Sequence, residues 1–159
     1  MTRPYYRIVP DYTHQNYGRC QLNSPLSDPA MQLRKGQILY IEDHDDTREL
    51  VALVLGQNGY NVTTDTTIEA GVTLAKSKTF DLYLLDSWLP DGSGLDLCKR
   101  IREFDRQTPI LFYSAAAFEL DREKAFESGA QAYLIKPSHL SELCDMVNIL
   151  IERAQPSVP

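Results

Sequence analysis

From residue 36 onward, short apolar runs alternate with segments in which apolar residues recur every three or four positions. Short apolar runs rich in strand formers predict buried strands, and the three-to-four spacing predicts helices with one apolar face. The predicted strands are residues 38–41, 60–64, 81–86, 109–113 and 132–135. The predicted helices are residues 46–58, 67–77, 95–103 and 119–128, with a fifth that begins near residue 138.

Five repeats of a strand followed by a helix are typical of one architecture. Parallel strands need crossover connections, the crossovers are right-handed, and the helices within them cover both faces of the sheet. The sequence therefore predicts an α/β fold built on a five-stranded, parallel, doubly wound sheet.

Two predicted helix ends depend on local signals. Asp46, with Glu49 three positions later, matches a capping box, so the first helix is expected to begin at Asp46. Gly129 is expected to close the fourth helix, because glycine readily adopts the left-handed conformation that ends helices.

The two ends of the chain lack these patterns. Residues 1–35 contain four prolines and show neither the helical nor the strand period, so they are predicted to form an irregular N-terminal arm. The tyrosines of this arm could dock on a partner or on the domain itself, but a solvated tail is the favoured interpretation. Residues 154–159 are predicted to be a C-terminal tail, too short for a DNA-binding or enzymatic output domain. The expected organisation is one domain at residues 36–153.

Composition limits the class of protein. A chain of 159 residues with 43% hydrophobic content is long enough to fold around its own core. Cys20, Cys98 and Cys144 have neither CxxC pairing nor metal-ligand spacing, which indicates thiols in a reducing compartment. No apolar stretch reaches the length of a membrane span, and the first residues do not resemble a signal peptide. We therefore expect a cytoplasmic protein without membrane insertion.

The net charge of −6 hides an uneven distribution. Residues 1–35 hold five basic and two acidic side chains, whereas the rest of the chain holds 11 basic and 20 acidic ones. Because nucleic-acid binding depends on lysine and arginine that neutralise phosphates, direct binding of nucleic acid by the acidic domain is not expected.

Polar residues follow several predicted strands directly. Asp86 ends the apolar run 83–85 and precedes a loop rich in proline and glycine, and the other residues at strand ends are Glu42, Asp43, Ser114 and Lys136. A parallel sheet brings all of these side chains to its carboxyl edge, where open α/β sheets bind ligands. Three acids placed together repel one another unless a cation joins them, and oxygen ligands suit Mg²⁺. A lysine and a hydroxyl beside them could hold phosphoryl oxygens, so the pattern predicts phosphoryl transfer onto Asp86.

Residues 36–153 resemble the receiver domains of two-component response regulators. The resemblance rests on several motifs that occur in order and at strand ends. They are Glu42-Asp43, Asp86 with Pro90 and Gly94 after it, Ser114-Ala115, and residues 133–137. It implies a flavodoxin-like (βα)5 sheet with strand order 2-1-3-4-5, and a single-domain regulator resembling chemotaxis regulators.

The resemblance also implies a role for each site residue. Asp86 would accept a phosphoryl group from a sensor histidine kinase or a phosphotransfer protein. Mg²⁺ would bind Asp43, Asp86 and the backbone carbonyl of Trp88, with Glu42 acting largely through water. The phosphoryl oxygens would be held by Ser114, the backbone of Ala115, and Lys136, whose peptide bond to Pro137 is expected to be cis.

The family further implies a switch and an output face. Tyr133 would follow the Ser114 hydroxyl inward and shift the surface formed by the fourth helix, fifth strand and fifth helix. That surface would bind a downstream protein or a second copy of the chain. Taken alone, however, Ser114 would more often cap the following helix, and Tyr133 would more often be half-buried packing.

Two positions depart from the commoner family pattern. Trp88 and Ala116 occupy the places that tune the attack of water on the aspartyl phosphate in receivers. Because an aliphatic or ring surface placed over the phosphoryl group cannot orient a water by hydrogen bonding, we expect slow self-dephosphorylation.

Two other functions remain open at the level of sequence. Aspartyl-phosphate phosphatases of similar fold also use a carboxylate nucleophile and Mg²⁺, but they carry a second aspartate where this chain has Trp88. The second open function is that of an interaction module whose binding does not depend on phosphorylation. The convergence of five polar residues argues against an inert pocket, since it serves no packing purpose.

Overall fold

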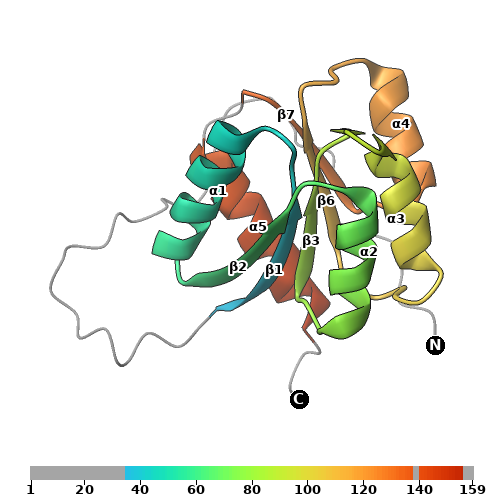
Figure 1. Ribbon diagram of the computed structural model, residues 1–159. Helices are drawn as coiled ribbons and strands as arrows, with labels where there is room; N and C mark the ends of the chain where they lie inside the picture. Colours follow the sequence, from blue (N-terminus) through green and yellow to red (C-terminus); the bar gives the residue numbers. More distant parts are fainter. Residues whose placement is uncertain (1–34, 138–139, 156–159) are drawn as a thin grey trace, which may run out of the picture.

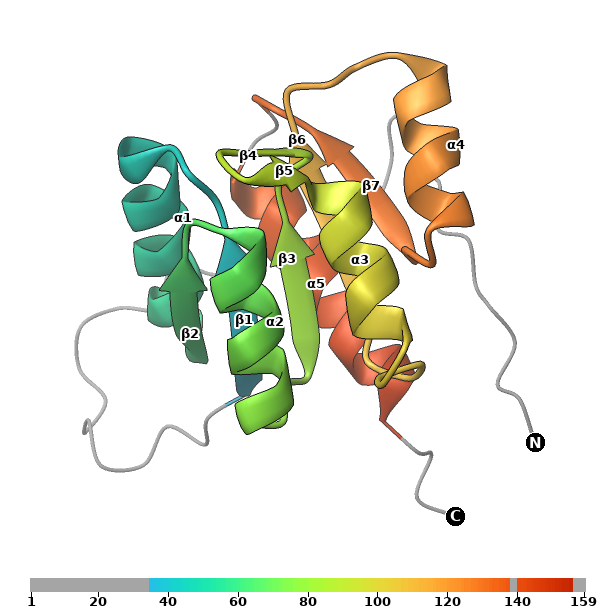
Figure 2. The ribbon, with the colours of Figure 1, turned by 45° about the vertical axis from the view of Figure 1, so that its right-hand side comes forward.

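The computed structural model describes residues 35–137 and 140–155. Five parallel strands form one sheet in the order β2-β1-β3-β6-β7, with helices on both faces (Figures 1 and 2). The strands are β1 (Gly36–Ile41), β2 (Tyr60–Asp65), β3 (Leu82–Leu85), β6 (Ile110–Ser114) and β7 (Ala132–Ile135). Counted along the chain, this is the order 2-1-3-4-5, so the predicted flavodoxin-like topology is confirmed.

Alternation along the strands divides the core into two layers, because successive side chains point to opposite faces of a sheet. Ile38 and Tyr40 face one layer, and Leu39 and Ile41 face the other. The first layer is closed by α1 (Asp45–Gln57) and α5 (Leu140–Ala154), and the second by α2 (Ile68–Ser77), α3 (Gly94–Arg102) and α4 (Glu119–Glu127). Burial of both faces explains why the strands are nearly continuous apolar runs.

Two local features differ from the prediction. The helix α1 begins at Asp45, and its N-cap His44 makes no side-chain capping bond, so the predicted capping box at Asp46 was wrong. Arg48 instead ties this turn to the strand before it, because it pairs with Asp45 and donates to the backbone carbonyl of Glu42 at 3.0 Å.

The loop after β3 contains a small antiparallel hairpin that the sequence did not reveal. It consists of β4 (Trp88–Leu89) and β5 (Gly92–Ser93), and Ser93 is the N-cap of α3. Asp91, at its tip, accepts hydrogen bonds from the backbone of Ile68 and Glu69 at 2.9 and 3.2 Å. The hairpin therefore joins the loop after β3 to the start of α2.

The structure also bears on the predictions for Gly129, the cysteines and membrane insertion. Gly129 has a φ of 109° and follows Ser128, the C-cap of α4, as predicted for the residue that closes this helix. Cys98 and Cys144 are buried thiols, whereas Cys20, most of the N-terminal arm and residues 156–159 lie outside the described residues. In the part of the chain that the structure describes, no helix is long and apolar enough to be a membrane span.

Candidate functional site

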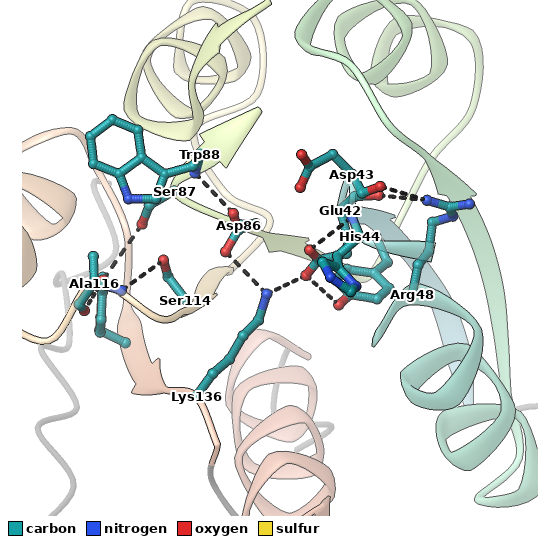
Figure 3. A network of polar contacts seen from close by, with 12 residues as sticks. Glu42, Asp43, His44, Arg48, Asp86, Ser87, Trp88, Ser114, Ala116 and Lys136 are labelled. Carbon is teal, nitrogen blue, oxygen red and sulfur yellow. Dashed lines mark hydrogen bonds and ion pairs between the residues drawn. The ribbon is translucent and has the colours of Figure 1, made fainter. Parts of the chain in front are cut away.

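The carboxyl edge of the sheet brings the predicted residues together (Figure 3). Glu42 and Asp86 follow β1 and β3 and are only 1% and 5% exposed, while Asp43 beside them is exposed. One carboxylate oxygen from each of these three acids lies within 4.8 Å of the others. Ser114 ends β6, and Lys136 follows β7. The convergence predicted from parallel topology is thus observed.

Asp86 is held by three hydrogen bonds from different parts of the chain. Its backbone N–H donates to the Ile41 carbonyl at 3.0 Å, which fixes it to β1. Its carboxylate accepts from the Trp88 N–H at 2.9 Å and from the Lys136 ammonium at 3.1 Å. The carboxylate that was predicted to react is therefore oriented from both sides and faces the other acids.

Gly94 explains how the loop closes over Asp86. A Cβ at this position would lie 1.9 Å from the backbone oxygen of Asp86, so no side chain fits there without a shift of backbone. The Gly94 N–H also donates to the Ser87 carbonyl at 2.9 Å. The glycine eight positions after the acid is thus needed for the close approach of the two backbones.

Glu42 accepts more hydrogen bonds than the sequence suggested. One carboxylate oxygen accepts from Lys136 and from the hydroxyl of Tyr40, the latter at 2.9 Å. The other oxygen accepts from the His44 N–H at 3.2 Å. Lys136 also lies over the ring of Tyr113, 5.4 Å from its centroid.

Sequence reasoning missed Tyr40 and Tyr113 because both resemble ordinary core residues of strands. A signal did exist for Tyr40, since a residue two positions before Glu42 in a strand lies on the same face. Burial, together with the neighbouring Glu42 carboxylate, raises the pKa of the Tyr40 hydroxyl above its ordinary value. The phenol therefore stays protonated and acts as a hydrogen-bond donor.

Ser114 and Tyr133 form a second group beside Asp86. Ser114 is fully buried, and its hydroxyl oxygen accepts from the Ala116 N–H at 3.3 Å. It does not cap α4, whose N-cap is Phe118. The Tyr133 ring is 1% exposed, and its hydroxyl donates to the Ala116 carbonyl at 2.7 Å. Burial raises the pKa of Tyr133, which keeps this donor protonated.

The rim of the site contains the remaining predicted residues. Trp88 has 68% of its surface exposed, and Ala115 is exposed as well. The bond between Lys136 and Pro137 is cis, as the resemblance implied. Three carboxylates balanced by one ammonium form a set of hard oxygen donors with excess negative charge, which fits a Mg²⁺ ion that keeps several of its waters.

Comparison with known proteins gives a consistent result. The sequence model of the family described as response regulator receiver domain matches residues 38–148. The cell cycle transcriptional regulator CtrA of Caulobacter vibrioides is 37% identical over 120 residues, and response regulator ArlR of Staphylococcus epidermidis is 33% identical over 116. These alignments cover 75% and 73% of this chain but only 52% of each relative, so the chain spans about half the length of these proteins.

Solved structures are similar as well. A two-component response regulator from Clostridium difficile superposes with a TM-score of 0.72 at 28% identity, covering 76% of this chain and 98% of that one. The receiver domain of sensor histidine kinase PA1611 from Pseudomonas aeruginosa, which has a magnesium ion coordinated in its active site cleft, gives 0.69 at 29% identity. That match covers 74% of this chain and 98% of the other.

Proposed function

The chain belongs to the response regulator receiver domains of two-component signalling, and from that premise we propose that Asp86 is its phosphoacceptor. The observation that carries the proposal is the position of the Asp86 carboxylate, between the Trp88 N–H and the Lys136 ammonium and beside two further acids. The donor is a phosphohistidine on a sensor histidine kinase or a phosphotransfer protein. An Asp86 oxygen attacks phosphorus, the bond from phosphorus to the histidine nitrogen breaks, and an aspartyl phosphate forms.

Mg²⁺ is the proposed cofactor. Asp43, Asp86 and the backbone carbonyl of Trp88 would hold it, with Glu42 acting largely through water. When bound, the ion neutralises charge on the transferring oxygens. The similar receiver domain of PA1611 has a magnesium ion coordinated in its active site cleft, and this supports the proposal of a Mg²⁺ site in the present chain.

The phosphoryl oxygens are bound by groups that surround Asp86. Lys136, which contacts both Glu42 and Asp86, turns its ammonium to one oxygen. The Ser114 hydroxyl and the Ala115 N–H donate to others. Each donor lies at the end of a strand or directly after it, so the backbone that carries these groups is already in place when charge develops.

The proposed switch links Ser114 to Tyr133. Once the Ser114 hydroxyl turns to the phosphoryl group, Tyr133 is favoured in its inward position, in which its hydroxyl bonds to the Ala116 carbonyl. The population of that position sets the shape of the surface formed by α4, β7 and α5. This surface binds the downstream protein target or, in a homodimer, a second copy.

The test of the phosphoacceptor is the mass of the protein after incubation with acetyl phosphate and Mg²⁺. The unmodified chain is expected to gain one phosphoryl group, and Asp86→Asn none. Asp96→Asn, on the exposed side of α3, is the matched control and should be labelled like the unmodified chain. Failure of the unmodified chain to form an adduct, also with beryllofluoride, would support the interaction module, and turnover of small phosphate esters would support the phosphatase.

Trp88 and Ala116 are proposed to prolong the phosphorylated state. The exposed Trp88 indole has an N–H donor but no acceptor, and the Ala116 methyl group has neither, so neither side chain can accept a hydrogen bond from a water that attacks the aspartyl phosphate. The double variant Trp88→Asn with Ala116→Glu is therefore expected to release phosphate faster than the unmodified chain after loading with acetyl phosphate. Equal or slower release would contradict this proposal.

A further inference from the structure

Tyr40 is a core residue with a polar contact to the candidate site. Its side chain is fully buried in β1, yet its hydroxyl donates to Glu42 at 2.9 Å. A phenylalanine would fill the same apolar space without the hydroxyl. The hydroxyl therefore matters chiefly for Glu42, which is itself 1% exposed.

The contacts of Glu42 differ in whether they would remain once a phosphoryl group is bound. Its carboxylate accepts from Tyr40, from the His44 N–H and from Lys136. Lys136 is shared with Asp86, and in the proposed function its ammonium turns to a phosphoryl oxygen. After that movement, Tyr40 and the His44 N–H are the described contacts that still orient Glu42.

The orientation of Glu42 matters because of what Mg²⁺ requires. The ion demands near-ideal octahedral geometry, and outer-shell groups that orient the oxygen donors around it commonly change metal affinity by about 10–100-fold. The Glu42 carboxylate is one of three whose oxygens converge within 4.8 Å. A hydroxyl that keeps it turned toward the other two contributes to cation binding without touching the cation.

We propose that Tyr40 is a positioning residue of the cation site, which holds the Glu42 carboxylate toward Asp43 and Asp86 whether or not Lys136 is engaged. This inference rests on the proposed function, since it assumes that Mg²⁺ binds among these acids.

The first test is a titration of the protein with Mg²⁺ alone. Binding is measured by calorimetry and by the fluorescence of Trp88, the one tryptophan of the chain. Tyr40→Phe is expected to weaken Mg²⁺ binding, so that the dissociation constant rises about tenfold. Tyr83→Phe is the matched control, because Tyr83 is also buried and donates at 2.9 Å to a carboxylate, Asp105, outside the acid cluster. Its Mg²⁺ dissociation constant should stay within about twofold of that of the unmodified chain.

The second test asks whether Tyr40 acts through Glu42. Glu42→Ala removes the carboxylate that Tyr40 orients, so adding Tyr40→Phe to it should change the dissociation constant by less than about twofold. An unchanged constant in the single Tyr40→Phe variant, or an equal loss in both backgrounds, would overturn the inference. Absence of Mg²⁺ binding by the unmodified chain would instead refute the proposed cation site, and the inference with it.

Discussion

The two ends of the sheet each contain a buried tyrosine that donates to a carboxylate. At the carboxyl end Tyr40 donates to Glu42, and at the amino end Tyr83 donates to Asp105, both at 2.9 Å. Burial is the main cause that raises the pKa of both phenols, and the neighbouring carboxylate adds to it. The local chemistry is the same, but the surroundings differ.

At the amino end, donors and acceptors are matched. Asp105 also accepts from the backbone of Gln107 and Thr108, each at 3.0 Å. Arg102 donates to the backbone oxygens of Asp105 and Gly129 and to the side chain of Gln131, at 2.9 to 3.0 Å. This network closes the turns before β6 and β7, so its hydrogen bonds favour the folded chain.

At the carboxyl end, Glu42 and Asp86 share the Lys136 ammonium, and the carboxylate of Asp43 lies beside them. This arrangement is a poor way to stabilise a fold, since the like charges repel. Residues that depart from good packing or pairing concentrate where a protein binds or reacts. The comparison thus separates an end of the sheet that supports the fold from an end that holds the proposed phosphoacceptor site.

The largest effect on stability is expected at two glycines that leave little room for a side chain, one at each end of the sheet. Gly94→Ala places a Cβ 1.9 Å from a backbone oxygen, whereas Gly129→Ala meets the flexible Arg102 side chain at 2.9 Å at a φ of 109°. We expect losses in the free energy of unfolding of about 3 kcal/mol or more at Gly94 and about 1–2 kcal/mol at Gly129. Urea unfolding measures both. Gly56→Ala in α1 is the control and should not destabilise the chain, because a Cβ there meets nothing within 4 Å apart from its chain neighbours and the backbone of its own helix.

The next largest effect on stability is expected when one carboxylate is neutralised at each end of the sheet. Asp105→Asn replaces an acceptor surrounded by donors and should lower the free energy of unfolding by about 1–3 kcal/mol. Asp86→Asn relieves repulsion among the acids, so without Mg²⁺ the variant should be as stable as the unmodified chain or more stable, by up to about 1 kcal/mol. A larger loss at Asp86 than at Asp105 would refute the distinction between the two ends.

Added Mg²⁺ should act at one end only. At ten times its dissociation constant, a ligand of the folded state stabilises by about 1.4 kcal/mol. We expect this gain in the free energy of unfolding, detected as a higher Tm in thermal unfolding, for the unmodified chain and for Asp105→Asn. Asp43→Asn and Asp86→Asn should lose most of it, and EDTA should reverse it. A gain that persists in Asp86→Asn would place the cation elsewhere.

The sequence predicted the functional end better than the supporting end. Glu42, Asp86 and Lys136 could be placed together because topology alone carries residues that follow parallel strands to one edge. The start of α1 was missed because Arg48, six positions after Glu42, bonds to the Glu42 carbonyl, and a capping rule does not include that contact. The network of Arg102 and Gln131 joins residues 29 positions apart, and no local pattern indicates it.

The smallest predicted effect depends on pH and concerns the amino end. Burial of Asp105 acts to raise its pKa, but the donors Thr108, Gln107 and Tyr83 together outweigh burial and lower the pKa below its ordinary value. A carboxyl with a lowered pKa in the folded state stabilises above its unfolded pKa of about 3.9, and the stabilisation disappears as the pH falls through the folded value.

The difference in the free energy of unfolding between the unmodified chain and Asp105→Asn should therefore be larger at pH 7 than at pH 3. Because Asp105 is only partly buried, solvent screening should keep this pH-dependent part below about 1 kcal/mol. Urea unfolding of both proteins at pH 7, 5 and 3 measures the difference. A difference that widens toward pH 3 would mean that the donors around Asp105 do not favour its ionised form, and the amino end would then lose its role as the matched, stabilising end.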